Sequence, residues 1–186
     1  MTTDELESLL DGAEETDTLE FKGAMSWERY SLTRDILAMA NVLDGGTIIV
    51  GIEDQTLARQ GLGDDQCSSF NIEEMRDQVA PFAHPEVEFR CEIVTDRNGL
   101  QFAVIQVSPF RDIPVICAKD AKGLNAGDIY FRSRRRRPES VRISSSTEMR
   151  DIIEAAIVRR SANLNRVGLV PATLDRYDYE SELGGL

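Results

Sequence analysis

The stretch that decides the fold of this chain is residues 15–54, ETDTLEFKGAMSWERYSLTRDILAMANVLDGGTIIVGIED. In its LEFK segment, which begins at Leu19, the polar residues Glu20 and Lys22 alternate with apolar ones. Successive side chains of a strand point to opposite faces, so this pattern predicts a strand with Glu20 and Lys22 on one face. Residues 47–52, TIIVGI, are mostly apolar and β-branched. Such a run is typical of a strand that is covered on both faces.

The segment between these two strands has the pattern of a helix. Its apolar residues recur at roughly helical spacing and predict an apolar stripe, formed by Leu32, Ile36, Leu37, Met39, Ala40 and Leu43. Asp44-Gly45-Gly46 is expected to end this helix, because glycine accepts the left-handed backbone that a helix end needs. Asn41 lies one turn before that end, where it either fastens the turn or points at a bound group.

Acidic residues follow the second strand directly, at Glu53 and Asp54. Ligand sites often collect where buried strands end. We therefore expect carboxylates at the mouth of a buried strand, close to Glu20 and Lys22. By sequence alone, the more common role of such acids is capping or solvation at the surface.

Three motifs carry a resemblance to a known family: ETDTLEFK, AMANVLDGGTIIVGIED and, later, DIYFRSR. Their order and spacing resemble the Schlafen-type AlbA-like domain over roughly residues 15–153. The family pattern has an acid before a hydrophobic-Glu-Phe-Lys strand, an Ala-aromatic-Ala-Asn-x-x-Gly-Gly helix end, a Gly-hydrophobic-Asp-Asp strand end and a Tyr-aromatic-Arg strand. This chain departs from it at Met39, at Glu53 and at residues 134–137, which replace an aromatic residue, an aspartate and a Gly-Ser-Ser-like turn.

The resemblance implies a candidate active site. In nuclease members of the family, three acids hold a divalent metal ion and the enzyme cuts structured RNA. Position by position, these acids correspond to Glu15, Glu20 and Asp54, with Lys22 as the nearby cation. Clustered carboxylates repel each other, and a hard cation such as Mg²⁺ or Mn²⁺ relieves that repulsion. The metal can activate water, and Lys22 can stabilise developing charge; alternatively, Lys22 simply forms an ion pair with Glu20.

A run of arginines is the second candidate site, formed by Arg132, Arg134, Arg135, Arg136 and Arg137. The run can grip phosphates by bidentate contacts, or it can be a solvated loop or an internal partner for acids. The net charge of −12, from 33 acids and 21 bases, argues against non-specific nucleic-acid binding. Eight acids and no base occupy residues 1–20, however, so the arginines still form a local basic patch.

Length and composition indicate a globular chain. The 186 residues suffice for one domain with a real core, and 41% are hydrophobic and 29% charged. No apolar run is long enough to span a membrane and no signal peptide is evident. Three widely separated cysteines favour a reducing cytoplasm. The single histidine, His84, has no catalytic partner signature, which argues against histidine-based RNA cleavage.

The rest of the chain predicts an α+β fold, with one domain, a Schlafen AlbA-like lobe, in which helices flank a mixed β-sheet. The expected helices are residues 3–10 (capped by Thr3), a helix after Asn71 and residues 148–160 (capped by Ser146 or Thr147). The expected strands are 86–94 (with Val87, Phe89, Cys91 and Ile93 inward), 100–107, 114–118 and 129–132, the last two paired, while 55–66 is expected to be a loop. We place the domain at 1–160 and an acidic C-terminal tail, which docks on the domain or a partner, at 161–186.

The leading functional hypothesis is a metal-dependent endoribonuclease that acts on structured, tRNA-like RNA. The alternatives are a non-catalytic nucleic-acid-binding or regulatory module, with RNA favoured over DNA, and a subunit of a larger nucleic-acid-processing or defence assembly that docks its acidic termini on a protein partner. Schlafen nucleases face two lobes across a groove, so the resemblance implies that this single lobe forms a homodimer.

Overall fold

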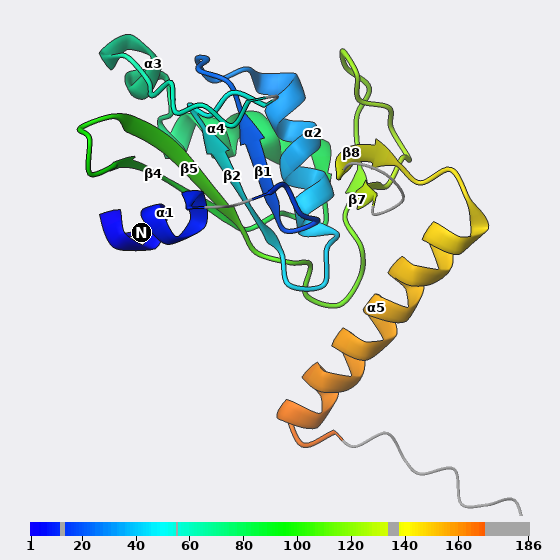
Figure 1. The fold of residues 1–186 in the computed structure, drawn as a ribbon. Helices are drawn as coiled ribbons and strands as arrows, with labels where there is room; N and C mark the ends of the chain where they lie inside the picture. The colour runs from blue at the N-terminus through cyan, green and yellow to red at the C-terminus, as the bar shows by residue number, and fades with distance from the viewer. Residues whose placement is uncertain (12–13, 55, 134–137, 170–186) are drawn as a thin grey trace, which may run out of the picture.

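The protein is an α+β domain built on a mixed four-stranded sheet (Figure 1). A computed structural model describes residues 1–11, 14–54, 56–133 and 138–169. The strand order is β1-β2-β5-β4, in which β1 and β2 are parallel and the other neighbours are antiparallel. The strands are β1 (Leu19–Lys22), β2 (Gly46–Val50), β4 (Phe89–Thr95) and β5 (Gln101–Val107). The predicted fold class is confirmed.

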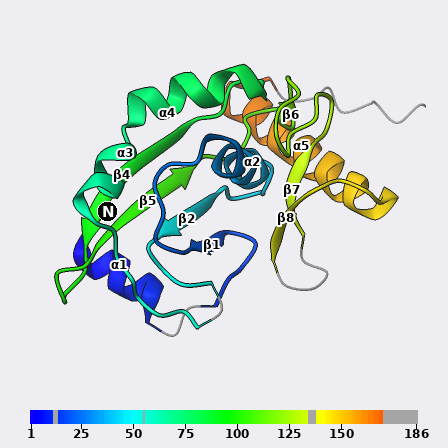
Figure 2. The same cartoon turned by 90° about the horizontal axis from the view of Figure 1, so that it is seen from above.

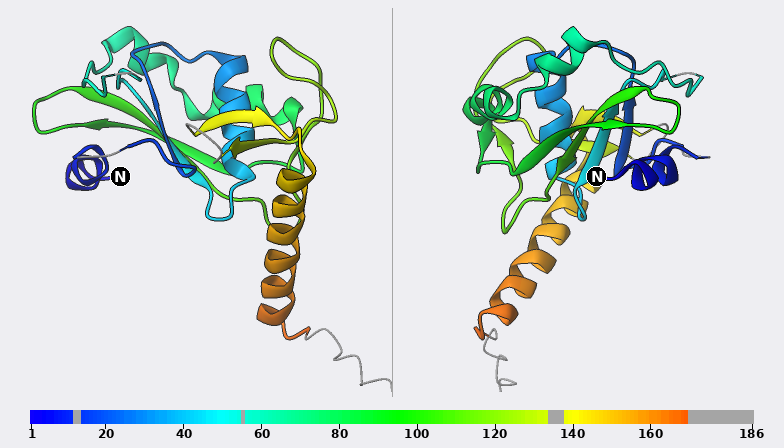
Figure 3. Two further views of the ribbon diagram at one scale, coloured as in Figure 1. Left: turned by 45° about the vertical axis from the view of Figure 1, so that its right-hand side comes forward. Right: turned by 90° about the vertical axis from the view of Figure 1, so that its left-hand side faces the viewer.

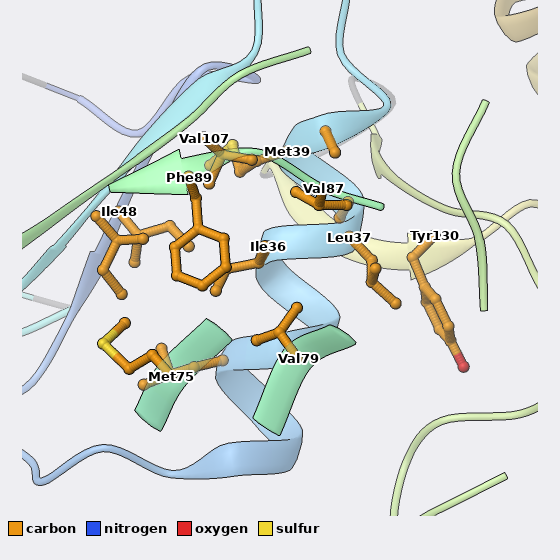
Figure 4. Packing of buried hydrophobic residues seen from close by; sticks show 14 of the residues in the cluster. Ile36, Leu37, Met39, Ile48, Met75, Val79, Val87, Phe89, Val107 and Tyr130 are labelled. Carbon is orange, nitrogen blue, oxygen red and sulfur yellow. The ribbon is translucent and has the colours of Figure 1, made fainter. Parts of the chain in front are cut away.

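Helices cover both faces of this sheet (Figures 2 and 3). On one face lie α2 (Arg29–Ala40) and α4 (Ile72–Val79), and on the other lies α1 (Thr3–Leu10). Because neighbouring side chains of β2 point to opposite faces, Ile48 packs under α2 while Ile49 packs under α1. Figure 4 shows the α2 side of the core, where side chains from α2, α4 and the sheet meet. The β-branched run was therefore read correctly as a strand buried on both faces.

The strand β4 corrects one detail of the predicted inward face. Phe89 is buried under α2 and α4 as expected, but Ile93 is exposed and its neighbour Val94 is buried. Val94 belongs to the opposite core cluster, under α1. The alternation is regular, but each end of β4 is covered by a helix on a different face, so the buried residues change parity along the strand.

The pairing of the later strands differs from the prediction. The segment at residues 114–118 does not pair with 129–132: its strand β6 (Ile116–Cys117) pairs with β3 (Ala83–His84). The strand β7 (Tyr130–Ser133) instead pairs antiparallel with β8 (Glu139–Arg142), which follows it directly in the chain. A nearby antiparallel partner costs less loop-closure entropy than a distant one. The hairpin of β7 and β8 packs beside α2 (Figure 2).

Several predicted helix ends shift by a few residues. The predicted loop at 55–66 ends early, because α3 (Asp64–Ser69) begins within it and is followed by α4, whose Asn71 cap is confirmed. A short 3-10 helix, η1 (Ala80–Phe82), follows α4. The cap of α1 is Thr2, one residue before the predicted Thr3, and the cap of the last helix is Ser145, one or two residues before the predicted Ser146 or Thr147. In both, the cap hydroxyl accepts a hydrogen bond from the third helical N–H.

The last helix, α5 (Ser146–Arg166), runs through the predicted domain boundary at residue 160 and projects away from the sheet (Figures 1 and 3). The first residues assigned to the C-terminal tail are therefore helical. Residues 170–186 lie outside the described part of the chain. None of the described helices has the length and apolar character needed to cross a membrane.

Candidate functional site

A pocket of about 380 Å³ brings the predicted catalytic residues together. All four of Glu15, Glu20, Lys22 and Asp54 line it. The other lining residues are Phe21, Gly23, Arg34, Asp35, Pro138, Glu139 and Ser140. The pocket therefore joins β1, the end of β2, α2 and the start of β8.

The sheet explains why these residues meet. Because β1 and β2 are parallel, they end at the same edge, and the carbonyl of Lys22 accepts hydrogen bonds from the N–H groups of Gly51 (2.8 Å) and Ile52 (2.9 Å). Asp54 follows two residues later. Glu15 reaches back to the same strand, where its Oε1 accepts a hydrogen bond from the Phe21 N–H (3.1 Å). The predicted juxtaposition follows from this parallel pairing.

Glu20 is the most enclosed of the predicted acids, with 5% of its surface exposed. Its Oε1 forms an ion pair with Lys22 and its Oε2 with Arg132 of β7. The Ser140 hydroxyl also donates a hydrogen bond to Oε2 (3.3 Å). Burial, together with the nearby charge of Asp35, raises the pKa of Glu20 even though both cations oppose the shift.

Asp35 is the site residue that the sequence argument missed. It lies on α2, is fully buried, and its Oδ2 is 3.1 Å from the Lys22 ammonium. Within the described residues, neither carboxylate oxygen accepts a hydrogen bond of good geometry. The signal was present, because Asp35 follows Leu32 by three residues and therefore falls on the apolar stripe that faces the sheet. A carboxylate on a buried stripe needs a counter-charge, and Lys22 supplies it.

Lys22 lies between the two buried carboxylates of Glu20 and Asp35. Burial alone would lower its pKa, but the charges of Asp35 and then Glu20 outweigh burial and raise it. Lys22 is therefore held as an ammonium ion at the pocket, with about a quarter of its side chain (27%) exposed.

Arg132, the first residue of the arginine run, does not lie at the surface. Arg132 is buried, with its guanidinium on Glu20 and on the carbonyl of Thr16 (3.2 Å), so the prediction that it contacts phosphate is wrong in this arrangement. Strand alternation turns Arg132 inward, where the buried carboxylate of Glu20 on β1 receives it. Arg134, Arg135, Arg136 and Arg137 lie outside the described residues. Both strands that this run connects are described, and Pro138 and Glu139 line the pocket.

The predicted metal centre does not fit the carboxylates as they are arranged. Across the described ranges, no three acidic, histidine or cysteine side chains are grouped closely enough to hold a metal ion. The physical reason is visible at Glu20, where each carboxylate oxygen already neutralises a cation. A divalent ion would have to compete with Lys22 and Arg132 for the same oxygens.

Asn41 has a structural role, which resolves the two interpretations of this residue. Its side-chain amide donates hydrogen bonds to the carbonyls of Val115 (2.9 Å) and Tyr130 (2.7 Å) and accepts one from the Val115 N–H (2.8 Å). Asn41 is buried directly after α2. It therefore fastens the end of α2 to the segment before β6 and to β7, which positions Arg132.

Comparison with known proteins agrees with the motifs. The sequence model of the Schlafen, AlbA_2 family matches residues 15–139, more than half of the chain. The chain belongs to this family. Membership indicates a nucleic-acid-related function. The matched region includes the whole β1–α2–β2 unit and all four predicted pocket residues, with Glu15 at its first position.

Two solved structures are similar at low identity. The DIP2311 protein from Corynebacterium diphtheriae is 19% identical, with a TM-score of 0.47, and the match covers 70% of this chain and 24% of that one. This chain thus spans about a quarter of that protein. The N-terminal domain of a RecG-related protein from Nitrosomonas europaea is also 19% identical, with a TM-score of 0.45, covering 78% of this chain and 91% of that one. No curated protein sequence matches the chain.

Proposed function

We propose that this domain binds nucleic acid, RNA in preference to DNA, along the rim of the carboxylate pocket. One observation carries the proposal: the hairpin whose connection holds Arg134–Arg137 borders the pocket through Pro138, Glu139 and Ser140. Four consecutive arginines are thereby attached to the edge of the pocket that contains the family motifs. Phosphate contacts supply most of the affinity of such proteins.

The charge of the pocket itself supports binding at the rim rather than inside. Glu20 and Asp35 carry negative charge that Lys22 and Arg132 largely balance, so these two cations are engaged within the protein. The described lining of the pocket holds five acids against the two cations Lys22 and Arg34, which disfavours a phosphate inside it. Salt screens the distant acids of this chain beyond about 10 Å. We therefore expect Arg134, Arg135, Arg136 and Arg137 to supply the phosphate contacts.

Binding of a structured RNA hairpin tests this proposal. Fluorescence anisotropy at several salt concentrations should show a negative slope of log K against log salt, and Arg135→Gln with Arg136→Gln should flatten that slope by about two. Two other exposed arginines, Arg90 and Arg97 on the β4–β5 hairpin, provide a matched control. Changing those two to glutamine should leave the slope as it is.

The competing result is equally clear. If the pair at 135 and 136 alters the slope no more than the pair at 90 and 97, the rim is not the binding surface. A duplex DNA of the same sequence, measured in parallel, reports the preference for RNA.

A metal-dependent endoribonuclease, using Mg²⁺ or Mn²⁺, is the second candidate function. The specific observation in its favour is that Glu15, Glu20, Asp54 and Lys22 all line one pocket. The arrangement of Glu20 between two cations does not favour a metal, as described above. Incubation of structured RNA with the protein and Mn²⁺ should then give cleavage that EDTA or Glu15→Gln abolishes. If the RNA is bound but stays intact in the presence of Mn²⁺, the result supports binding and contradicts the nuclease function.

A further inference from the structure

A second pocket, the α5 groove, lies between the second half of α5 and the segment that follows β5. Its volume is about 790 Å³, and it shares no lining residue with the carboxylate pocket. Its base includes the apolar residues Pro109, Leu164 and Val167. Its charged lining residues are four arginines and one acid, namely Arg111, Arg159, Arg160, Arg166 and Asp112. The groove is therefore basic, although the chain as a whole is acidic.

Hydrogen bonds join the two walls of the α5 groove. The side-chain amide of Asn163 on α5 donates to the carbonyl of Arg111 (3.0 Å) and to Oδ1 of Asp112 (2.8 Å) on the opposite wall. The guanidinium of Arg111 forms an ion pair with Glu88. The acid of the groove is thus already engaged, and one of its arginines has a partner.

The three arginines of α5 in this groove lack counter-charges. Within the part of the chain that the structure describes, Arg159, Arg160 and Arg166 form no ion pair. The guanidinium of Arg159 lies over the ring of Phe110 (5.5 Å), and its buried Nε has no hydrogen-bond partner among the described residues. Buried donors normally have an acceptor. Neighbouring positive charges repel each other, so an anionic occupant would stabilise the groove.

The chain turns at the end of α5 beside this groove. Gly168 has a φ of 73° and donates a backbone hydrogen bond to the carbonyl of Asn165 (3.1 Å), while the Leu169 N–H donates to the carbonyl of Leu164 (2.9 Å). These two bonds form a Schellman motif, which turns the chain back at a helix end. Because Leu164 and Val167 line the groove, residues 170–186 begin at its edge.

The sequence of residues 170–186 complements the groove. It holds four acids against one arginine, together with apolar residues that suit the base of the groove: Asp175, Asp178, Glu180, Glu182, Arg176, Leu174, Tyr177 and Tyr179. From Leu169 back to Arg160 the helix measures about 14 Å. Six extended residues span up to about 20 Å. The first acid, Asp175, is therefore within reach of all the arginines of α5 that line the groove.

We infer that residues 170–186 dock in the α5 groove of their own chain, with their acids on Arg160 and Arg166. Attachment at Leu169 gives this segment a millimolar effective concentration at the groove, which a free phosphate group or a second copy of the chain lacks. The inference assigns a site to the predicted docking of the acidic tail. It does not depend on whether the rim of the carboxylate pocket binds RNA.

Limited chymotrypsin digestion of the full chain, followed by mass spectrometry, tests the inference at Tyr177 and Tyr179. Cleavage there should be about tenfold slower than in a synthetic peptide of residues 170–186, because each exposed ion pair strengthens docking by a factor of a few. Arg160→Gln with Arg166→Gln should restore most of the rate of the peptide. Arg90→Gln with Arg97→Gln is the matched control, in which the protection should persist.

Two outcomes of the digestion would overturn the inference directly. One is cleavage of the unaltered chain as fast as the peptide, and the other is equal acceleration by the two arginine pairs. The digestion is repeated at several concentrations of the chain. Protection that grows with concentration would mean that the segment docks on a second copy, which contradicts docking within one chain.

NMR of the isotope-labelled full chain locates the contact. A variant with Asp175→Asn, Asp178→Asn, Glu180→Gln and Glu182→Gln should shift the amide signals of Arg111, Asn163 and Val167 and leave that of Asn98 in place. Unmoved groove signals would contradict the inference. If an RNA hairpin moved those signals where the variant did not, the groove would be a phosphate site instead of the site of the tail.

Discussion

Two clusters of charged residues in this domain differ in how their carboxylates are satisfied. At the α1 end, Arg59 contacts Glu7 (2.8 Å), Asp96 (3.3 Å) and Asp11 (3.1 Å). At the pocket, Lys22 and Arg132 contact Glu20, and Lys22 contacts Asp35. Each cluster combines acids with arginine or lysine around buried carboxylates. Only the second cluster lies at the pocket that is lined by residues of the family motifs.

Backbone hydrogen bonds to the buried carboxylates distinguish the cluster at α1 (the α1 cluster) from the cluster at the pocket (the pocket cluster). Asp96 Oδ1 accepts hydrogen bonds from the N–H groups of Asn98 (2.8 Å) and Leu100 (2.9 Å), and Glu7 Oε1 accepts one from the Arg97 N–H (2.8 Å). The backbone hydrogen bond from Arg97, with Arg59, lowers the pKa of Glu7. Burial opposes ionisation of Asp96, but its hydrogen bonds outweigh burial and lower its pKa as well.

The pocket cluster has the opposite character. The pKa of Glu20 is raised, and Asp35 and the Arg132 Nε lack hydrogen-bond partners among the described residues. Under-satisfied buried charges with perturbed pKa values concentrate at functional sites. The α1 cluster therefore stabilises the fold, whereas the pocket cluster tolerates an electrostatic cost at the site of the proposed function.

Removing the central cation of each cluster should give the largest contrast. Arg132→Met should destabilise the protein by about 3–5 kcal/mol, because it leaves the buried carboxylates of Glu20 and Asp35 with Lys22 alone. Arg59→Met should cost only about 1–2 kcal/mol, because Glu7 and Asp96 keep their backbone hydrogen bonds. Urea unfolding at neutral pH measures both. Equal losses would mean that the two clusters do not differ as described.

The pH dependence of stability should differ in sign between the clusters. The raised pKa of Glu20 contributes stability below its ordinary value of 4.5, and this contribution is lost as pH rises through the raised pKa. The lowered pKa of Asp96 contributes stability above its ordinary value of 3.8, and this contribution is lost as pH falls through the lowered pKa.

The measurement compares unfolding free energies of the unaltered protein with those of Glu20→Gln and Asp96→Asn across acidic pH. The advantage of the unaltered protein over Asp96→Asn should grow with rising pH, while its advantage over Glu20→Gln should shrink. Slopes of the same sign would contradict the assignment of opposite pKa shifts.

The sequence was sufficient for the parts of the site that depend on local pattern. Alternation placed Glu20 and Lys22 on one face of β1, and the parallel strand pair then brought Asp54 to the same pocket. Asp35 was also within reach of the helical pattern, because it interrupts an apolar stripe. Local periodicity therefore carried the fold class and the grouping of Glu20, Lys22 and Asp54, whereas Glu15 came from the resemblance to the family.

The remaining features depend on tertiary contacts that periodicity does not contain. Arg132 was grouped with its arginine neighbours, but its inward direction depends on how the β7–β8 hairpin packs on α2 and on the Asn41 hydrogen bonds. The pairing of β6 with β3 joins segments far apart in the chain. The length of α5 depends on tertiary contacts, whereas the predicted boundary at residue 160 followed the fading of the apolar pattern beyond Ser161.

The most direct test of the central claim is an NMR titration of isotope-labelled protein with a structured RNA hairpin. We expect chemical-shift changes at the amides of pocket residues such as Gly23, Arg34 and Glu139, with little change at Asn98 and Leu100 of the α1 cluster. Changes that are absent from the pocket, or that concentrate at the α1 cluster, would contradict the claim that RNA binds at the pocket rim.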